Sequence, residues 1–146
     1  MWTPDITVAA ICEQNGRFLL VKERAKSSNK IVFNQPAGHL EEGESIIDAV
    51  IRETREETCR HFQPQSLIGL YRLPLENGKT YIRYTFFGSI SNVDPSLELD
   101  QDIISTHWLT VDEIRSHDAL RSPLVMTCLD DFLNGKQYPL DILREL

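Results

Sequence analysis

The sequence of 146 residues contains no run of about 18 apolar residues, the length that a membrane-spanning helix requires. Its first residues lack a basic segment ahead of an apolar one, so we expect no secretory signal peptide. Cysteine is also scarce: Cys12, Cys59 and Cys128 are odd in number and form no C-x-x-C pair. This pattern argues against a disulfide framework or a zinc knuckle, and it favours a cytoplasmic protein with reduced thiols.

Basic residues are outnumbered, with 15 Lys and Arg against 22 Asp and Glu and a formal net charge of −7. Such a surface repels phosphate backbones and anionic lipids, so we expect no nucleic-acid partner and no membrane partner. Two segments hold the acidic excess: 38–60 has seven acids and three arginines, and 91–102 has four acids and no base. We therefore expect an anionic substrate to be attracted by divalent cations bound at these segments.

No repeat or linker divides the sequence, which predicts a single domain over residues 1–146. Apolar runs separated by turn residues predict strands over 6–12, 17–21, 31–33, 66–73, 80–90 and 105–109. The first two of these strands, and separately 66–73 with 80–90, read as β-hairpins. Helical patterns cover 44–60, a short segment capped by Thr110 with Glu113, and a segment from 122 to 135. The fold class is therefore α/β, an α+β mixed sheet with helices on its faces.

Three glutamates of the predicted central helix share one arc of its surface at about 100° per residue. Glu53, Glu56 and Glu57 adjoin the apolar stripe within 46–51, so their carboxylates are expected at the edge of the core. Like charges this close repel one another, and the negative end of the helix dipole disfavours them further. Mg²⁺, or alternatively Mn²⁺, would relieve both problems because it prefers hard oxygen ligands.

Neutralisation by neighbouring arginines is the alternative interpretation of these glutamates. Arg52–Glu56 and Glu56–Arg60 have the i, i+4 spacing of helical ion pairs. The triplet alone leaves both interpretations open, because helices rich in Glu and Arg are common.

The surrounding spacing is Gly38-x5-Glu44-x7-Arg52-Glu53-x-x-Glu56-Glu57. Six fixed positions match by chance on the order of one in ten million per register. The pattern over 38–60 is the Nudix box, and the sequence resembles the Nudix hydrolases, which cleave nucleoside diphosphates linked to another moiety. The resemblance implies a single-domain α/β/α sandwich around a mixed sheet, in which the box forms a loop, a helix and a second loop.

The same resemblance implies roles for individual residues. The metal ligands would be Glu53, Glu56, Glu57 and the backbone carbonyl of Gly38, with Arg52 and Glu44 orienting the ligand helix. Cys59 stands where the family has glycine, which costs about 1 kcal/mol if the residue must adopt the left-handed conformation. Thr54 and Arg60 replace the usual aliphatic residues.

For the proton acceptor in catalysis we favour Glu53 over Glu57 or an acid from a later loop. Asp102, six residues before Trp108, best matches the loop acid that many Nudix enzymes supply. Its rivals are Glu98 and Asp100, and a merely solvated acidic loop is the alternative.

Basic groups outside the box are candidates to hold phosphate oxygens. They are Arg24 and Arg83, with Arg17 and Lys22 as further possibilities. Within the box, His39 next to Gly38 is another candidate to donate to a phosphate oxygen. A structural role for His39 is the alternative. Trp2, Phe33, Tyr84 and Phe86 are candidates to stack on a base, although core packing is favoured for each.

Two further stretches extend the resemblance over nearly the whole chain. Residues 34–41 and the tail, 121–125 with Gly135 and 138–140, are similar to the bacterial phosphatase NudJ subfamily. This resemblance implies release of phosphate from nucleoside tri- and diphosphates, and hydrolysis of the thiamine-pathway intermediate hydroxymethylpyrimidine pyrophosphate. The alternatives are a house-cleaning pyrophosphohydrolase that releases pyrophosphate and a non-catalytic nucleotide-binding module. The intact glutamate set argues against the module.

Overall fold

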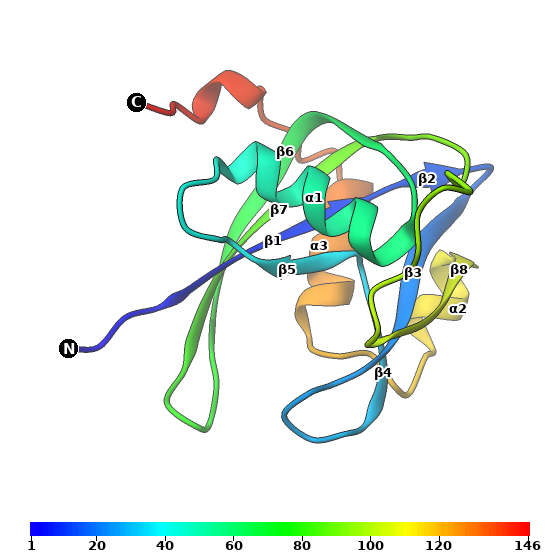
Figure 1. Ribbon diagram of the computed structural model, residues 1–146, viewed down its shortest axis with the longest axis horizontal. Helices are drawn as coiled ribbons and strands as arrows, with labels where there is room; N and C mark the ends of the chain where they lie inside the picture. Colours follow the sequence, from blue (N-terminus) through cyan, green and yellow to red (C-terminus); the bar gives the residue numbers. More distant parts are fainter.

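The computed structural model describes residues 1–146 and consists of strands, helices and connecting loops (Figure 1). The strands are β1 (Asp5–Ile11), β2 (Glu13–Gln14), β3 (Arg17–Arg24), β4 (Ile31–Asn34), β5 (Ala37–His39), β6 (Phe62–Pro74), β7 (Thr80–Ile90) and β8 (Ile103–Thr110). The helices are α1 (Ile46–Thr58), α2 (Val111–Arg115) and α3 (Leu124–Leu133), followed by a 3-10 turn, η1 (Leu140–Ile142). The predicted helices all form, and the capping box of Thr110 and Glu113 is present at α2.

The strands form two sheets. One has the order β5-β1-β7-β6, in which β1 runs parallel to β7 and the other pairs are antiparallel. In the other sheet β3 pairs antiparallel with β2, β4 and β8. The predicted hairpin of β6 and β7 is confirmed, and its parallel neighbour β1 makes the sheet mixed, as expected.

The first predicted hairpin is wrong in its pairing. Asn15 and Gly16 do form a turn with positive φ angles of 52° and 76°, but this turn joins the two-residue strand β2 to β3. Strand β1 belongs to the other sheet, between β5 and β7. The reason is burial: Val8, Ala9 and Ala10 are fully buried, so β1 takes a central position with a partner on each side.

The core lies on both faces of β1. Val8 and Ala10 pack with Ala49 and Val50 of α1, whereas Ile11 packs with the cluster that includes α3. Because successive strand residues point to opposite faces, α1 and α3 cover opposite sides of the β5-β1-β7-β6 sheet. The α/β/α sandwich is thereby confirmed, with α1 across the near face of the sheet in Figure 1. The structure contains no helix with the length and apolar character needed to cross a membrane.

Candidate functional site: the glutamates of helix α1

Helix α1 presents the glutamates between two well-defined ends. Its first turn is capped by Ser45, whose side chain accepts a hydrogen bond from the Asp48 backbone N–H at 3.0 Å. Its last turn closes at Cys59, which has φ 57° and ψ 29° and donates its N–H to the Arg55 carbonyl. Cys59 thus adopts the left-handed conformation of the family's glycine and bears a strain of about 1 kcal/mol.

The three glutamates lie at increasing depth along the edge of the core. The side chain of Glu56 is 40% exposed, that of Glu53 is 13% exposed, and Glu57 is buried. Glu57 Oε1 accepts a hydrogen bond of 2.9 Å from the backbone N–H of Ala37 in β5. The angular position inferred from the helical period therefore agrees with the observed burial.

Gly38 lets strand β5 approach the helix closely. A Cβ atom at this position would lie 2.1 Å from the Glu53 carboxyl carbon, far inside van der Waals contact. The absence of a side chain at Gly38 is what allows its backbone and the Glu53 carboxylate to lie side by side.

Arg52 is the cation around which the acids gather. It binds Glu44 through two hydrogen bonds, Nε to Oε2 at 2.9 Å and Nη2 to Oε1 at 2.8 Å. Its Nη1 donates to Glu53 at 2.9 Å and to Glu56 at 3.1 Å, and lies 3.4 Å from Glu41. Four carboxylates thus share one guanidinium, which leaves most of their negative charge uncompensated.

The expected neutralisation of the glutamates by neighbouring arginines is therefore only partly present. The Arg52–Glu56 pair forms, but Arg60 turns away from Glu56. The Arg60 guanidinium donates to the Ser91 carbonyl at 3.0 Å and lies over the Trp108 ring at 5.5 Å. Arg60 consequently contributes to packing at the end of α1 rather than to neutralisation of the glutamates.

Burial and mutual repulsion act on the acids of this site. Desolvation raises the pKa of Glu53 to about 7, against the favourable effect of Arg52. Desolvation also raises the pKa of Glu57 well above its usual value, and the nearby charge of Glu23 adds to this. The opposite holds for Glu44, whose pKa is lowered by its hydrogen bonds with Arg52. The site therefore favours the arrival of positive charge at Glu53 and Glu57.

The donor set fits a hard divalent cation, since it consists of carboxylate oxygens with the Gly38 backbone close to Glu53. In this structure no three His, Cys, Asp or Glu side chains converge on a single point. The reason is local: Arg52 holds the carboxylates of Glu53 and Glu56, and the Ala37 N–H holds that of Glu57. To bind one cation together, the three glutamates would have to change their side-chain rotamers. The helix already places them on one arc of its surface.

The segment 91–102 docks on the end of α1. The Glu56 carbonyl accepts from the Asp100 N–H at 2.9 Å, and the Cys59 carbonyl accepts from the Asp94 N–H at 2.7 Å. Asp94 also contacts His61 Nε2 at 2.9 Å. These bonds satisfy carbonyls that a helix end leaves without partners, and they fix the acidic loop beside the glutamates.

The acids of the loop 91–102 differ in the charged groups on which they act. The charge of Asp100, which is exposed, adds to the effect of burial in raising the pKa of both Glu53 and Glu57. Asp102, the acid favoured from the sequence, instead forms an ion pair with Lys26 at 3.3 Å. Both acids line a cavity of about 390 Å³ that also includes Glu56 and Glu98.

The predicted phosphate-binding residues are scattered. Arg83 on β7 is buried at 3% exposure, and its Nη2 donates to Gln35 Oε1 at 2.9 Å. Arg24 is exposed and donates to the Asn29 carbonyl, while Arg17 pairs with Glu113. His39, within the box, is exposed, and its backbone carbonyl accepts from Arg52.

Most candidate stacking residues are part of the core. Phe86 is fully buried and Tyr84 packs against the same cluster beneath α1. Phe33 lies against the His117 ring, with centroids 4.3 Å apart. Trp2 alone is mainly exposed, at 66%.

Two charged residues near the glutamates, one acidic and one basic, were not predicted from the sequence. Glu23 of β3 is buried, forms an ion pair with Arg121, and acts on Glu57 through its charge. Lys26 lines the acidic cavity. Neither had a sequence signal, because a polar stretch between two strands looks the same whichever of its side chains turns inward.

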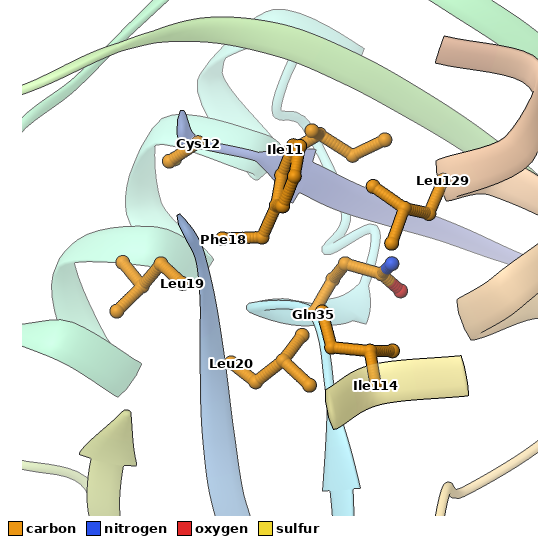
Figure 2. Close-up of a pocket in the computed structure, with 8 residues that line it drawn as sticks. All are labelled: Ile11, Cys12, Phe18, Leu19, Leu20, Gln35, Ile114 and Leu129. Atoms are coloured by element: carbon orange, nitrogen blue, oxygen red, sulfur yellow. The ribbon is translucent and has the colours of Figure 1, made fainter. Parts of the chain in front are cut away.

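A second pocket lies inside the molecule and is apolar. Figure 2 shows its lining, in which Gln35 is the one residue that is not hydrophobic. Its interior does not admit a water-sized molecule. This space is a packing gap of the core near α3 and offers no room for a ligand.

The chain has close relatives among known proteins. A model of the NUDIX domain family matches residues 1–127. Phosphatase NudJ of Escherichia coli is 34% identical over 145 residues, covering 99% of this chain and 94% of that protein. A NUDIX hydrolase from Nitrosomonas europaea is 47% identical, with a TM-score of 0.94 over 99% of this chain and 98% of that one. The MutT protein from Methanosarcina mazei shares the fold, with a TM-score of 0.75 over 93% of this chain and 99% of that one, at 24% identity.

Proposed function

We propose, since this chain belongs to the Nudix hydrolase family, that it hydrolyses phosphoanhydride bonds with the help of a divalent cation, Mg²⁺ or alternatively Mn²⁺. Its substrates would be nucleoside di- and triphosphates or hydroxymethylpyrimidine pyrophosphate, with release of inorganic phosphate. The name of the phosphatase from Escherichia coli, similar over nearly the full chain, supports this choice of product.

The observation that carries the proposal is the charge imbalance around Arg52. Four carboxylates share this one guanidinium, and Glu57 has only a backbone N–H as partner. The cation would be held by Glu53, Glu56, Glu57 and the carbonyl of Gly38. When bound, it supplies the neutralisation of phosphate charge and lowers the pKa of the attacking water.

The remaining steps fall to the protein's own groups. Arg52, through its paired hydrogen bonds to Glu44, orients the ligand helix against β5. Glu53 would accept the proton of the attacking water, with Glu57 or a loop acid as alternatives. Among loop acids, the charge effects on Glu53 and Glu57 favour Asp100, whereas Asp102 has its own partner in Lys26.

Further phosphate contacts would come from His39, Arg24 or Arg83. His39 and Arg24 are exposed and free to reach a ligand. Arg83 is enclosed, and its Nε has no hydrogen-bond partner. A ligand group that reached Arg83 would have to displace part of the surrounding packing.

The test is an assay of phosphate and pyrophosphate release with Mg²⁺. Glu57→Gln is expected to lower kcat by about 100-fold or more, because it removes a buried ligand charge while preserving shape. The matched control is Glu42→Gln, at an exposed position of the same box, which should retain activity. Equal turnover by wild type and Glu57→Gln would overturn the proposal. Pyrophosphate as the sole inorganic product would instead indicate the pyrophosphohydrolase alternative.

A further inference from the structure

The connection between β4 and β5 carries the chain from one sheet to the other. Strand β4 pairs with β3, whereas β5 pairs with β1 in the second sheet. Gln35 and Pro36 lie between the two strands and belong to neither. Pro36 has no N–H, although its carbonyl accepts from the Ala10 N–H at 2.9 Å. The position of this short connection therefore depends on the contacts of a few groups, among them the side chain of Gln35.

The Gln35 side chain anchors the connection on the α3 side of the molecule. Gln35 is only 3% exposed, and its Nε2 donates to the Val125 carbonyl of α3 at 2.9 Å. Its Oε1 accepts from Arg83 Nη2, also at 2.9 Å. Because both ends of the amide are hydrogen-bonded, its orientation is fixed.

The residues that follow Gln35 meet the glutamates of α1. The Ala37 N–H, two residues on, donates to Glu57 Oε1 at 2.9 Å, and the Gly38 backbone lies against the Glu53 carboxylate. Residues 35–38 are thus held by α3 at one end and contact α1 at the other. Since peptide planes are rigid, a shift at Gln35 would move the Ala37 N–H as well.

Arg83 is a costly partner for a glutamine. It is 3% exposed on β7, its Nε has no hydrogen-bond partner, and burial lowers the pKa of its guanidinium. A buried charge with so few partners costs free energy. An uncharged side chain of similar length, such as methionine, would avoid this cost. Packing alone therefore does not account for an arginine at this position.

We infer that Gln35 and Arg83 are positioning residues for the cation site: Arg83 orients the Gln35 amide, which holds the connection so that the Ala37 N–H meets the Glu57 carboxylate. This inference rests on the proposed function and names the groups that would fix one of its ligands. Arg83 then acts through Gln35 and does not itself contact a phosphate.

The first test is hydrogen exchange of the Ala37 amide in the metal-free protein, followed by NMR. Gln35→Met and Arg83→Met preserve side-chain length, and each should accelerate this exchange about tenfold, because the hydrogen bond to Glu57 opens more often. The internal reference is the Leu67 N–H, which donates to the Tyr138 carbonyl at 2.9 Å. A general loss of stability would accelerate exchange at both amides, so the expected effect is a change in their ratio.

The matched control is Tyr71→Phe. It removes a hydrogen bond of 2.7 Å to Asp131, which also joins the β5-β1-β7-β6 sheet to α3 but has no link to residues 35–38. Exchange at Ala37 relative to Leu67 should match wild type in this variant.

The second test is Mn²⁺ binding without nucleotide, followed by electron paramagnetic resonance. Each single variant should weaken binding about tenfold, as does the loss of other groups that orient metal ligands. The double variant should bind no more weakly than Gln35→Met alone, because Arg83 acts through Gln35. Tyr71→Phe should bind as wild type does. A direct phosphate contact by Arg83 would instead raise KM and leave Mn²⁺ affinity unchanged in Arg83→Met.

An unchanged exchange ratio or unchanged Mn²⁺ affinity in the single variants would overturn the inference, and so would additive losses in the double variant or equal losses in Tyr71→Phe. If Gln35→Met does not fold, Arg83→Met decides by the same two readouts. The proposed function fails separately, if the variants behave as expected but wild type hydrolyses neither nucleoside phosphates nor hydroxymethylpyrimidine pyrophosphate. Absence of Mn²⁺ binding by wild type would overturn both.

Discussion

Gly38 shows how a single position controls the geometry of the site. Its φ angle is not in the left-handed region, so flexibility is not the reason for glycine here. The reason is space, since any Cβ would overlap the Glu53 carboxylate. The effect of a side chain at Gly38 can therefore be separated from the effect of backbone strain.

Gly38→Ala is expected to displace the Glu53 carboxylate and to lower kcat about tenfold or more, as small misplacements of reacting groups are costly. Phosphate release with Mg²⁺ measures the effect. Gly43→Ala is the control: Gly43 has φ +79°, and a Cβ there would meet nothing within 4 Å. This control should lose about 1 kcal/mol of stability and keep its activity. Wild-type turnover by Gly38→Ala would contradict the close contact.

At the scale of elements, the end of α1 and the loop 91–102 form one unit. Hydrogen bonds from Asp94 and Asp100 to the carbonyls of Cys59 and Glu56 hold them together. Cys59, in the left-handed conformation, ends the helix at this point. The end of the helix therefore holds the acidic loop next to its own glutamates.

Substitutions in the loop test this arrangement. Asp100→Asn is expected to lower kcat about tenfold or more, because the charge that acts on both Glu53 and Glu57 is lost. Asp102→Asn should act mainly on KM, since its partner is Lys26 rather than a glutamate of α1. Steady-state kinetics at saturating Mg²⁺ distinguish the two. A larger loss of kcat in Asp102→Asn would restore the residue favoured from the sequence.

For the whole molecule, the buried charge of Glu53 links stability to pH and to cations. Its folded-state pKa of about 7 lies above the usual 4.5, so the folded protein binds more protons than the unfolded chain between these values. The free energy of unfolding of the metal-free protein should therefore fall as the pH rises through this range. Ionised Glu53 destabilises the fold above pH 7.

Glu53→Gln should remove this loss. Relative to wild type, the metal-free variant is expected to gain about 1–2 kcal/mol between pH 4.5 and pH 8, a value reduced for solvent screening. Urea unfolding at the two pH values measures it, with Glu42→Gln as the exposed control. Added Mg²⁺ should stabilise wild type more than Glu53→Gln, because a cation that binds only the folded state raises its stability. A pH-independent difference between variant and wild type would contradict the burial effect.

Local patterns in the sequence predicted a large part of this molecule. The helix of the box, the capping box at Thr110 and the hairpin of β6 and β7 each depend on residues within a few positions of one another. The pairing of β1 did not follow, because a turn at Asn15 and Gly16 specifies the strand directly before it and not the longer strand beyond. Strand pairing over long separations is decided by burial on both faces.

Helical period and spacing are local properties, so the amino-acid sequence was enough to predict the family, the helix that carries Glu53, Glu56 and Glu57, and the arc on which they lie. Three features emerge only in the folded protein: Arg83 is enclosed, Asp102 pairs with Lys26, and an acidic cavity opens beside the end of α1. These are contacts between segments far apart in the chain. Their geometry follows from the path of the backbone, which no local pattern of residues records.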